Sequence, residues 1–157
     1  MSFFGKTHER ILRKFLAHDV EFVLMGGHAA VFYGVRRTTS DIDILVKPTL
    51  ANGEKVIKAF KSLQLNLSDI SASDFATQNV FTFGVEPEAV DILTYTLGVD
   101  VETVFTNASY HKIDDLKLKV IDLRDLLRNK ESLNRKDEKG LVDQQDILAL
   151  RRILKKK

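Results

Sequence analysis

The stretch Phe22–Val46, FVLMGGHAAVFYGVRRTTSDIDILV, decides the fold because it joins two apolar runs across a glycine turn. The first run ends at Gly26 and Gly27, which predicts a buried strand followed by a tight turn. The residues from His28 to Tyr33 then favour a short helix. The unpaired amide groups at a helix start attract phosphate, and glycines let phosphate approach the backbone closely. We therefore expect a phosphate site at this turn.

The second run, Asp41–Val46, carries an acidic residue at alternate positions. Side chains alternate across a sheet, so Asp41 and Asp43 share one face while Ile42 and Ile44 take the other. Two like charges on one strand face repel and give the fold no obvious benefit. Hard oxygen ligands suit Mg²⁺ or Mn²⁺, and such a pair can hold one ion, or two about 3.5–4 Å apart, for in-line phosphoryl or nucleotidyl displacement. The pattern therefore predicts a metal site.

The loop between these runs, residues 35–40, is polar and contains Arg36 and Arg37. A guanidinium can bind phosphate at two points, or it can offset the charge of the two aspartates in the empty protein. Thr39 and its hydroxyl neighbours can bond phosphate or the backbone of the loop itself. His28 is open to two interpretations as well, a phosphate contact or packing at a helix start.

The glycine turn followed by Arg37-x-Thr39-x-Asp41-x-Asp43 resembles the signature of the DNA polymerase beta-like nucleotidyltransferase superfamily. The resemblance is nearest to small bacterial members related to toxin–antitoxin nucleotidyltransferases, and the motif spans about a sixth of the chain. It implies a third carboxylate on a later strand, for which Asp91 is the match. By this resemblance Asp41 and Asp43 hold the metals, and Asp91 ligates one of them and helps to deprotonate the acceptor hydroxyl.

The resemblance extends weakly to the C-terminal part of the chain. It implies that Lys130 contacts the nucleotide phosphates and that Asp146, three residues after Asp143, supports Lys130 or the acceptor. Residues 131–140 are additional to the family pattern. The alternative for Lys130 is a favourable cation near a helix C-terminus. The nucleotide-binding residues expected in all are Gly26, Gly27, His28, Arg37, Thr39 and Lys130.

The remaining pattern predicts an α/β (α+β) fold, a mixed sheet with helices packed against it and helices at the C-terminus. Strands at residues 80–85 and 89–95 favour an antiparallel hairpin. If the second of them pairs beside Asp41–Val46, Asp91 reaches the same metal; otherwise Asp91 lies on an edge strand and faces water. Other expected segments are helices over 8–18, about 55–63, 100–105, 122–130 and 137–154, strands at 109–113 and 118–121, and a connection over 65–77 with a helical turn near 74–76.

Length and composition favour one domain over residues 1–157, with a core over about 20–95 and a helical part over about 122–154. No apolar run approaches the roughly 20 residues that span a bilayer, and the first residues do not match a signal peptide. We therefore expect a cytoplasmic protein without membrane contact. The chain has no cysteine, which excludes disulfides, thiolate zinc sites and cysteine nucleophiles.

Charge is distributed unevenly along the chain. Residues 1–107 hold 10 basic and 13 acidic side chains, a net −3, whereas residues 108–157 hold 14 basic and 9 acidic ones, a net +5. A positive surface beside a nucleotide site can attract RNA or a partner protein. The alternative is a solvated helix face with a basic tail.

These features together favour a metal-dependent enzyme that transfers a nucleoside monophosphate from a triphosphate such as ATP to a hydroxyl acceptor. A non-catalytic subunit of the same fold, used for binding or as an antitoxin, is the alternative. A dinucleotide-dependent oxidoreductase is excluded because Gly26-Gly27-His28 cannot supply the G-x-G-x-x-G turn. The sequence does not identify the base or the acceptor, which is an RNA, a protein or a small molecule.

Overall fold

The computed structural model describes residues 2–65 and 67–157, and this part of the chain forms one six-stranded sheet with helices packed against it. The strands are β1 (Phe22–Leu24), β2 (Ile42–Val46), β3 (Val80–Phe83), β4 (Val90–Leu93), β5 (Ser109–Ile113) and β6 (Leu116–Val120). The helices are α1 (Lys6–Ala17), α2 (Gly26–Tyr33), α3 (Leu50–Ser62), α4 (Val101–Asn107), α5 (Leu123–Ser132) and α6 (Glu138–Lys155), with a 3-10 turn, η1 (Ala72–Ala76).

The sheet is mixed, with the strand order β3-β4-β2-β1-β6-β5. Strand β2 runs parallel to β4 and antiparallel to β1, and β1 runs parallel to β6. The two sequence hairpins, β3–β4 and β5–β6, are antiparallel and form the two sides of the sheet. The predicted α/β class with a mixed sheet is confirmed.

The core lies mainly where aromatic side chains of α1 and α3 meet the sheet. Phe15 of α1 packs edge to face against Phe22 of β1 and against Phe60 of α3. The strand register places Ile44 on the same face as Phe22, because β1 pairs with β2 through Phe22–Val46 and Leu24–Ile44. The alternate residues of β2 therefore face away from α1, and Asp43 is one of them.

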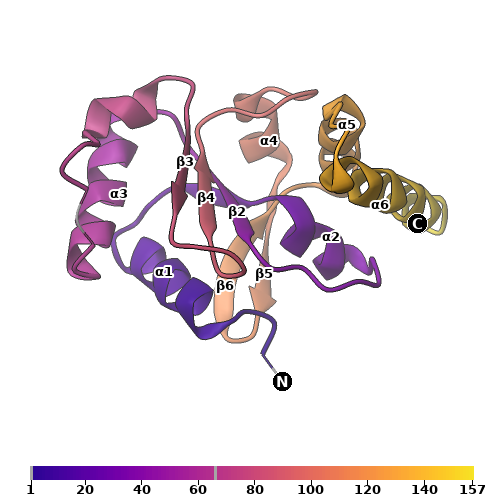
Figure 1. The fold of residues 1–157 in the computed structure, drawn as a ribbon, viewed down its shortest axis with the longest axis horizontal. Coiled ribbons are helices and arrows are strands. Elements are labelled where there is room, and N and C mark those ends of the chain that lie inside the picture. Colours follow the sequence, from indigo (N-terminus) through magenta and orange to yellow (C-terminus); the bar gives the residue numbers. More distant parts are fainter. Residues whose placement is uncertain (1, 66) are drawn as a thin grey trace.

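Helices α2, α5 and α6 gather at one end of the sheet, opposite α3, as Figure 1 shows. Helix α2 follows β1 directly, and its first residue, Gly26, has a φ of +60°. Backbone with positive φ is accessible to glycine at little cost, so the strand can turn sharply into the helix. Helices α5 and α6 pack against each other and against α2, which brings the C-terminal part of the chain to the glycine turn.

The expected segments correspond to observed elements with small shifts at their ends. Helix α1 begins at Lys6 rather than residue 8, and β6 begins at Leu116 rather than residue 118. The helical turn expected near residues 74–76 is η1. Residue 66, within the expected connection, and residue 1 lie outside the described residues. No helix in the described part of the chain combines the length and the apolar character needed to cross a bilayer.

Candidate functional site

Two acidic side chains meet where β2 pairs with β4. Asp43 and Asp91 are register partners in this parallel pair, so their side chains leave the same face of adjacent strands. The pKa of Asp43 is raised to about 7. Burial is the largest cause, and the charge of Asp91 and a hydrogen bond with it add to the effect. Strand β4 has neighbours on both sides, so Asp91 is not on an edge strand. Its Oδ1 also accepts a hydrogen bond of 2.6 Å from Oγ1 of Thr82 on β3.

The third predicted ligand, Asp41, lies just before β2 begins. Its Oδ1 accepts a hydrogen bond of 3.1 Å from the backbone amide of Ala89. Across residues 2–65 and 67–157, no three histidine, aspartate or glutamate side chains are arranged to hold a metal ion. Asp41 lines the same cleft as Asp43 and Asp91, but the directly interacting carboxylates are the latter two.

The glycine turn lies against this carboxylate pair. A Cβ atom at Gly26 would overlap Oδ2 of Asp43, and a Cβ atom at Gly27 would lie 2.5 Å from Oγ1 of Thr39 and 2.9 Å from Nη2 of Arg37. Gly26, whose φ is positive, therefore leaves no room for a side chain beside Asp43, whereas a side chain at Gly27 would displace the ends of Thr39 and Arg37. The turn, the arginine and the acidic strand are thus brought into one site.

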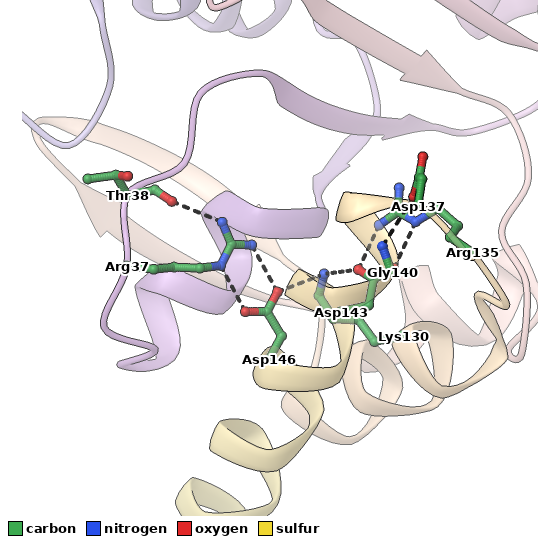
Figure 2. Close-up of polar contacts among 8 residues, drawn as sticks. All are labelled: Arg37, Thr38, Lys130, Arg135, Asp137, Gly140, Asp143 and Asp146. Atoms are coloured by element: carbon green, nitrogen blue, oxygen red, sulfur yellow. Dashed lines mark hydrogen bonds and ion pairs between the residues drawn. The ribbon is translucent and has the colours of Figure 1, made fainter.

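A buried carboxylate on α6 links the cations from two other elements. Asp146 is fully buried, and its two oxygens accept hydrogen bonds of 2.8 Å from Nε and Nη2 of Arg37. Nζ of Lys130 on α5 lies 3.0 Å from Asp146 (Figure 2). Burial alone would raise the pKa of Asp146, but the hydrogen bonds and charges of Arg37 and Lys130 hold it below its usual value.

A second buried carboxylate extends this network toward the loop between α5 and α6. Asp143 lies 3.3 Å from Nζ of Lys130 and accepts hydrogen bonds of 2.8 and 2.6 Å from Arg135 (Figure 2). Three cations therefore face two carboxylates in the network made by Arg37, Lys130, Arg135, Asp143 and Asp146. We call these five residues the ion-pair network. Its net charge of +1 suits an anionic ligand.

A single cleft of about 470 Å³ connects these parts. Its lining includes Gly27, Arg37, Thr39, Asp41, Asp43, Asp91, Lys130, Arg135 and Asp143. Gly26 lines an adjoining cavity together with Asp43 and Asp91. The fold thus gathers all three predicted acidic residues and all but one of the predicted nucleotide-binding residues.

The exception is His28, which is buried and lines neither cavity. Its ring stacks on Phe4 at 5.6 Å and meets His8 edge to face at 5.5 Å. Burial, with smaller contributions from the neighbouring charges, lowers the pKa of His28 to about 4. His28 therefore lies where the packing interpretation places it, and its side chain does not line the cleft.

Four cleft residues, Glu86, Arg135, Lys139 and Val142, were not foreseen from the sequence. Arg135 lies in residues 131–140, the segment additional to the family pattern, and Glu86 lies in the turn between the two predicted strands. The useful signal for Arg135 was its position between Lys130 and the aspartates of the last helix, since an unpaired buried aspartate needs a cation.

The donor set fits a hard divalent cation. Asp43 and Asp91 place two carboxylates side by side, and burial together with the charge of Asp91 raises the pKa of Asp43 to about 7. A cation bound to both would favour their ionised forms. Carboxylate oxygens are the ligands that Mg²⁺ and Mn²⁺ prefer. Asp41 could add an oxygen from the same cleft after releasing Ala89.

Comparison with known proteins identifies the fold. No known family model and no curated protein matches the sequence. The lincomycin-bound structure of LnuA, a lincosamide antibiotic adenylyltransferase, aligns over 96% of this chain and 98% of its own, with a TM-score of 0.59 and 18% identity. An antigenic nucleotidyltransferase-like protein from Paracoccidioides brasiliensis aligns over 92% of this chain and 74% of its own, with a TM-score of 0.61 and 15% identity.

A third similar structure is a nucleotidyltransferase candidate from Thermotoga maritima. It aligns over 97% of this chain and 92% of its own, with a TM-score of 0.56 and 14% identity. Together these likenesses show that the chain has the nucleotidyltransferase fold. At such low identity the likeness concerns the fold alone, and function has to be argued from the site.

Proposed function

We propose that this protein is a metal-dependent nucleotidyltransferase that transfers a nucleoside monophosphate from a triphosphate to a hydroxyl acceptor and releases pyrophosphate. The observation that carries the proposal is one cleft lined by groups of both signs. It holds the Asp43–Asp91 pair together with Gly27, Arg37 and Lys130. Carboxylates for a cation beside cations for phosphate are what a metal–triphosphate complex requires.

In this proposal the phosphates lie along the glycine turn, where backbone amides of α2 and the Thr39 hydroxyl donate hydrogen bonds. Arg37 and Lys130 supply the positive charge, and Asp146 fixes the direction of both side chains. Asp43 and Asp91, with Asp41 beside them, would hold Mg²⁺ or Mn²⁺. When bound, such an ion neutralises phosphate charge and orients the reacting oxygens.

The reaction is an in-line displacement at the α-phosphorus. The acceptor hydroxyl gives its proton to the Asp91 carboxylate as its oxygen forms a bond to the α-phosphorus. The bond from the α-phosphorus to the oxygen bridging the β-phosphate breaks, and pyrophosphate leaves beside Arg37 and Lys130. Because both cations are held in place before the reaction, they stabilise the leaving charge without reorganising.

A non-catalytic binding or antitoxin-like subunit is the second candidate. The observation that favours it is that Arg37 and Lys130 have carboxylate partners within 3.0 Å, so the fold itself largely neutralises these two cations. A relation to toxin–antitoxin nucleotidyltransferases and an RNA or protein partner stay predictions. LnuA is named as modifying an antibiotic, which extends the acceptors to consider for this chain to small molecules.

Calorimetric titration with ATP, GTP, CTP and UTP, each with and without Mg²⁺, tests the proposal. We expect at least one triphosphate to bind only with Mg²⁺, and we expect Asp43→Asn to abolish the metal dependence. The exposed aspartate Asp69 provides the control variant Asp69→Asn, which should bind like the wild type. Absence of metal-dependent binding for all four triphosphates would favour the non-catalytic candidate.

A further inference from the structure

A second cavity, of about 230 Å³, adjoins the cleft at the carboxylate pair. The two cavities share Asp43, Asp91, Lys130 and Arg135. The second cavity contains no residue of the loop 37–40 that contributes to the cleft. The residues that line this cavity but not the cleft include Val80, Leu93, Tyr95, Leu97 and Leu133, which are apolar or aromatic. We call this cavity the apolar chamber.

The walls of the chamber include large apolar side chains that are open to solvent. Val80 and Leu97 each expose 49% of their surface. Apolar surface held in water costs free energy that a ligand recovers when it covers the surface. The loop that carries Leu97 is also fixed, because the Asn129 side-chain amide donates hydrogen bonds to Oγ1 of Thr96 at 2.8 Å and to the Leu97 carbonyl at 3.0 Å. The chamber is therefore preformed.

In-line displacement determines what the chamber can hold. The leaving pyrophosphate and the attacking oxygen must lie on opposite sides of the α-phosphorus. Gly27, Thr39 and Arg37 line the cleft but not the chamber, so we assign the pyrophosphate side to them. The chamber shares only Asp43, Asp91, Lys130 and Arg135 with the cleft, so a hydroxyl group bound in it would lie beside Asp91 and away from Arg37.

We propose that the apolar chamber binds the acceptor, and that the acceptor is a compact small molecule with an apolar or aromatic body and a hydroxyl group. This inference rests on the proposed function. The volume lies just below the roughly 300 Å³ at which small-molecule sites usually begin, which fits a compact body. An RNA end requires a positive groove that follows its backbone, whereas the residues that line only the chamber carry no charge.

The step balances without another reactant. The hydroxyl oxygen of the small molecule bonds to the α-phosphorus, the bond between that phosphorus and the pyrophosphate oxygen breaks, and the hydroxyl proton passes to Asp91. The products are a nucleotidylated small molecule and pyrophosphate.

Variants of the chamber test the inference. Leu97→Arg and Val80→Arg place charge in the chamber at positions that are already half exposed, so the fold should tolerate them. The matched control is Leu148→Arg on α6, which is 53% exposed and lines neither the cleft nor the chamber. Each protein is incubated with an α-labelled triphosphate, Mg²⁺ and either the low-molecular-weight or the RNA fraction of a cell extract, and its triphosphate affinity is measured by calorimetry.

We expect wild type and Leu148→Arg to label a compound of the low-molecular-weight fraction. Both chamber variants should lower this transfer at least tenfold while keeping the triphosphate Kd within twofold. Loss of triphosphate affinity in the chamber variants would mean that the chamber holds the nucleobase, which overturns the inference. Labelling of RNA alone, or of nothing, overturns it too. Labelling of RNA leaves the proposed function standing, whereas the proposed function itself fails if no triphosphate binds with Mg²⁺ or if neither fraction is labelled.

Discussion

Asp43 is a buried acid whose neighbour opposes its ionisation. Burial and the adjacent Asp91 raise its pKa to about 7, above the ordinary value of 3.8 that it regains in the unfolded chain. Between these values the folded protein binds more protons than the unfolded chain, so Asp43 lowers the free energy of unfolding as pH rises from about 4 to about 7. A residue with this effect is costly for folding, which agrees with a role in binding a cation.

We predict that Asp43→Asn stabilises the metal-free protein. The gain should be small near pH 4 and reach on the order of a few kcal/mol near pH 8, where the wild-type carboxylate is ionised. Urea unfolding in the presence of a chelator, at several pH values, measures the difference between the two proteins. Asp69→Asn serves as the control, and a gain independent of pH would contradict the ionisation argument.

Gly27 allows a close approach between the turn and the loop before β2. A Cβ atom there would meet Thr39 at 2.5 Å and Arg37 at 2.9 Å, so both side chains would have to move. We predict that Gly27→Ala weakens triphosphate binding about tenfold, because a displaced charged hydrogen bond is worth roughly 1.5–3 kcal/mol. The calorimetric titration with Mg²⁺ described above measures this change.

Gly5→Ala is the matched control for this substitution. A Cβ atom at Gly5 would meet only Oε1 of Glu88, at 4.0 Å. The triphosphate affinity of Gly5→Ala should equal that of the wild type. An unchanged affinity in Gly27→Ala as well would place the phosphates elsewhere than along this turn.

Residue chemistry explains which side chains could be foreseen. Asp41 and Asp43 stood out because acids are rare in strands, and Asp91 was named from the family resemblance; the expected strands of Asp43 and Asp91 do pair side by side. Arg135 lies in an irregular segment, so only its position between Lys130 and the aspartates of α6 pointed to it. Whether His28 would pack or bind phosphate depended on where Phe4 and α1 lie, which is a tertiary contact that local sequence does not encode.

Helix α6 connects the site to the C-terminal part through Asp146. We predict that Asp146→Asn lowers the free energy of unfolding by about 3 kcal/mol, because it leaves the buried Lys130 and the partly buried Arg37 poorly compensated. The same change should raise the KM for the triphosphate, since Arg37 and Lys130 lose their common anchor. Urea unfolding and steady-state kinetics measure the two effects.

The same pair of helices offers a control at its surface. Glu131 of α5 and Arg151 of α6 form an exposed ion pair of 2.6 Å. Glu131→Gln should change stability by about 0–1 kcal/mol and leave KM unchanged. If Asp146→Asn behaved like this surface variant, Asp146 would have no positioning role.

Helices α1 and α2 meet at His28, which gives the fold a sensitivity to acid. The folded pKa of about 4 lies below the usual 6.5, so the stability associated with neutral His28 is complete above about pH 6.5 and is lost as pH falls toward 4. We predict that His28→Gln flattens the fall in stability over this range. Unfolding curves at matched pH values measure it, with His18→Gln as a control; an unchanged slope would contradict burial as the cause.

Element types were predictable where the periodicity was strong. The strands at β2 and β4 and the helices at α1, α3, α5 and α6 follow from apolar spacing and turn residues. The sheet order was less accessible, because β1 pairs with the distant β6 through a long-range parallel contact. Such pairings depend on packing of the whole chain rather than on any local pattern.

For the whole molecule, the basic excess of residues 108–157 has more than one role. Lys130 and Arg135 belong to this part, and both are engaged by carboxylates of the ion-pair network, Lys130 in the interior and Arg135 at the surface. The exposed remainder includes Lys112 and Lys117, which are cross-strand partners on the β5–β6 hairpin. The net charge of a segment therefore overstates the positive charge that is available to bind a polyanion such as RNA. Binding of RNA stays a prediction.

The position of the label after transfer tests the central claim most directly. Wild type and Asp43→Asn are incubated with Mg²⁺, a cell extract and the bound triphosphate labelled either at the α-phosphate or at the γ-phosphate. We predict that wild type transfers the α-label to an acceptor and releases the γ-label as pyrophosphate, and that Asp43→Asn lowers this by several orders of magnitude. Transfer of the γ-label, or undiminished transfer by Asp43→Asn, would contradict the account.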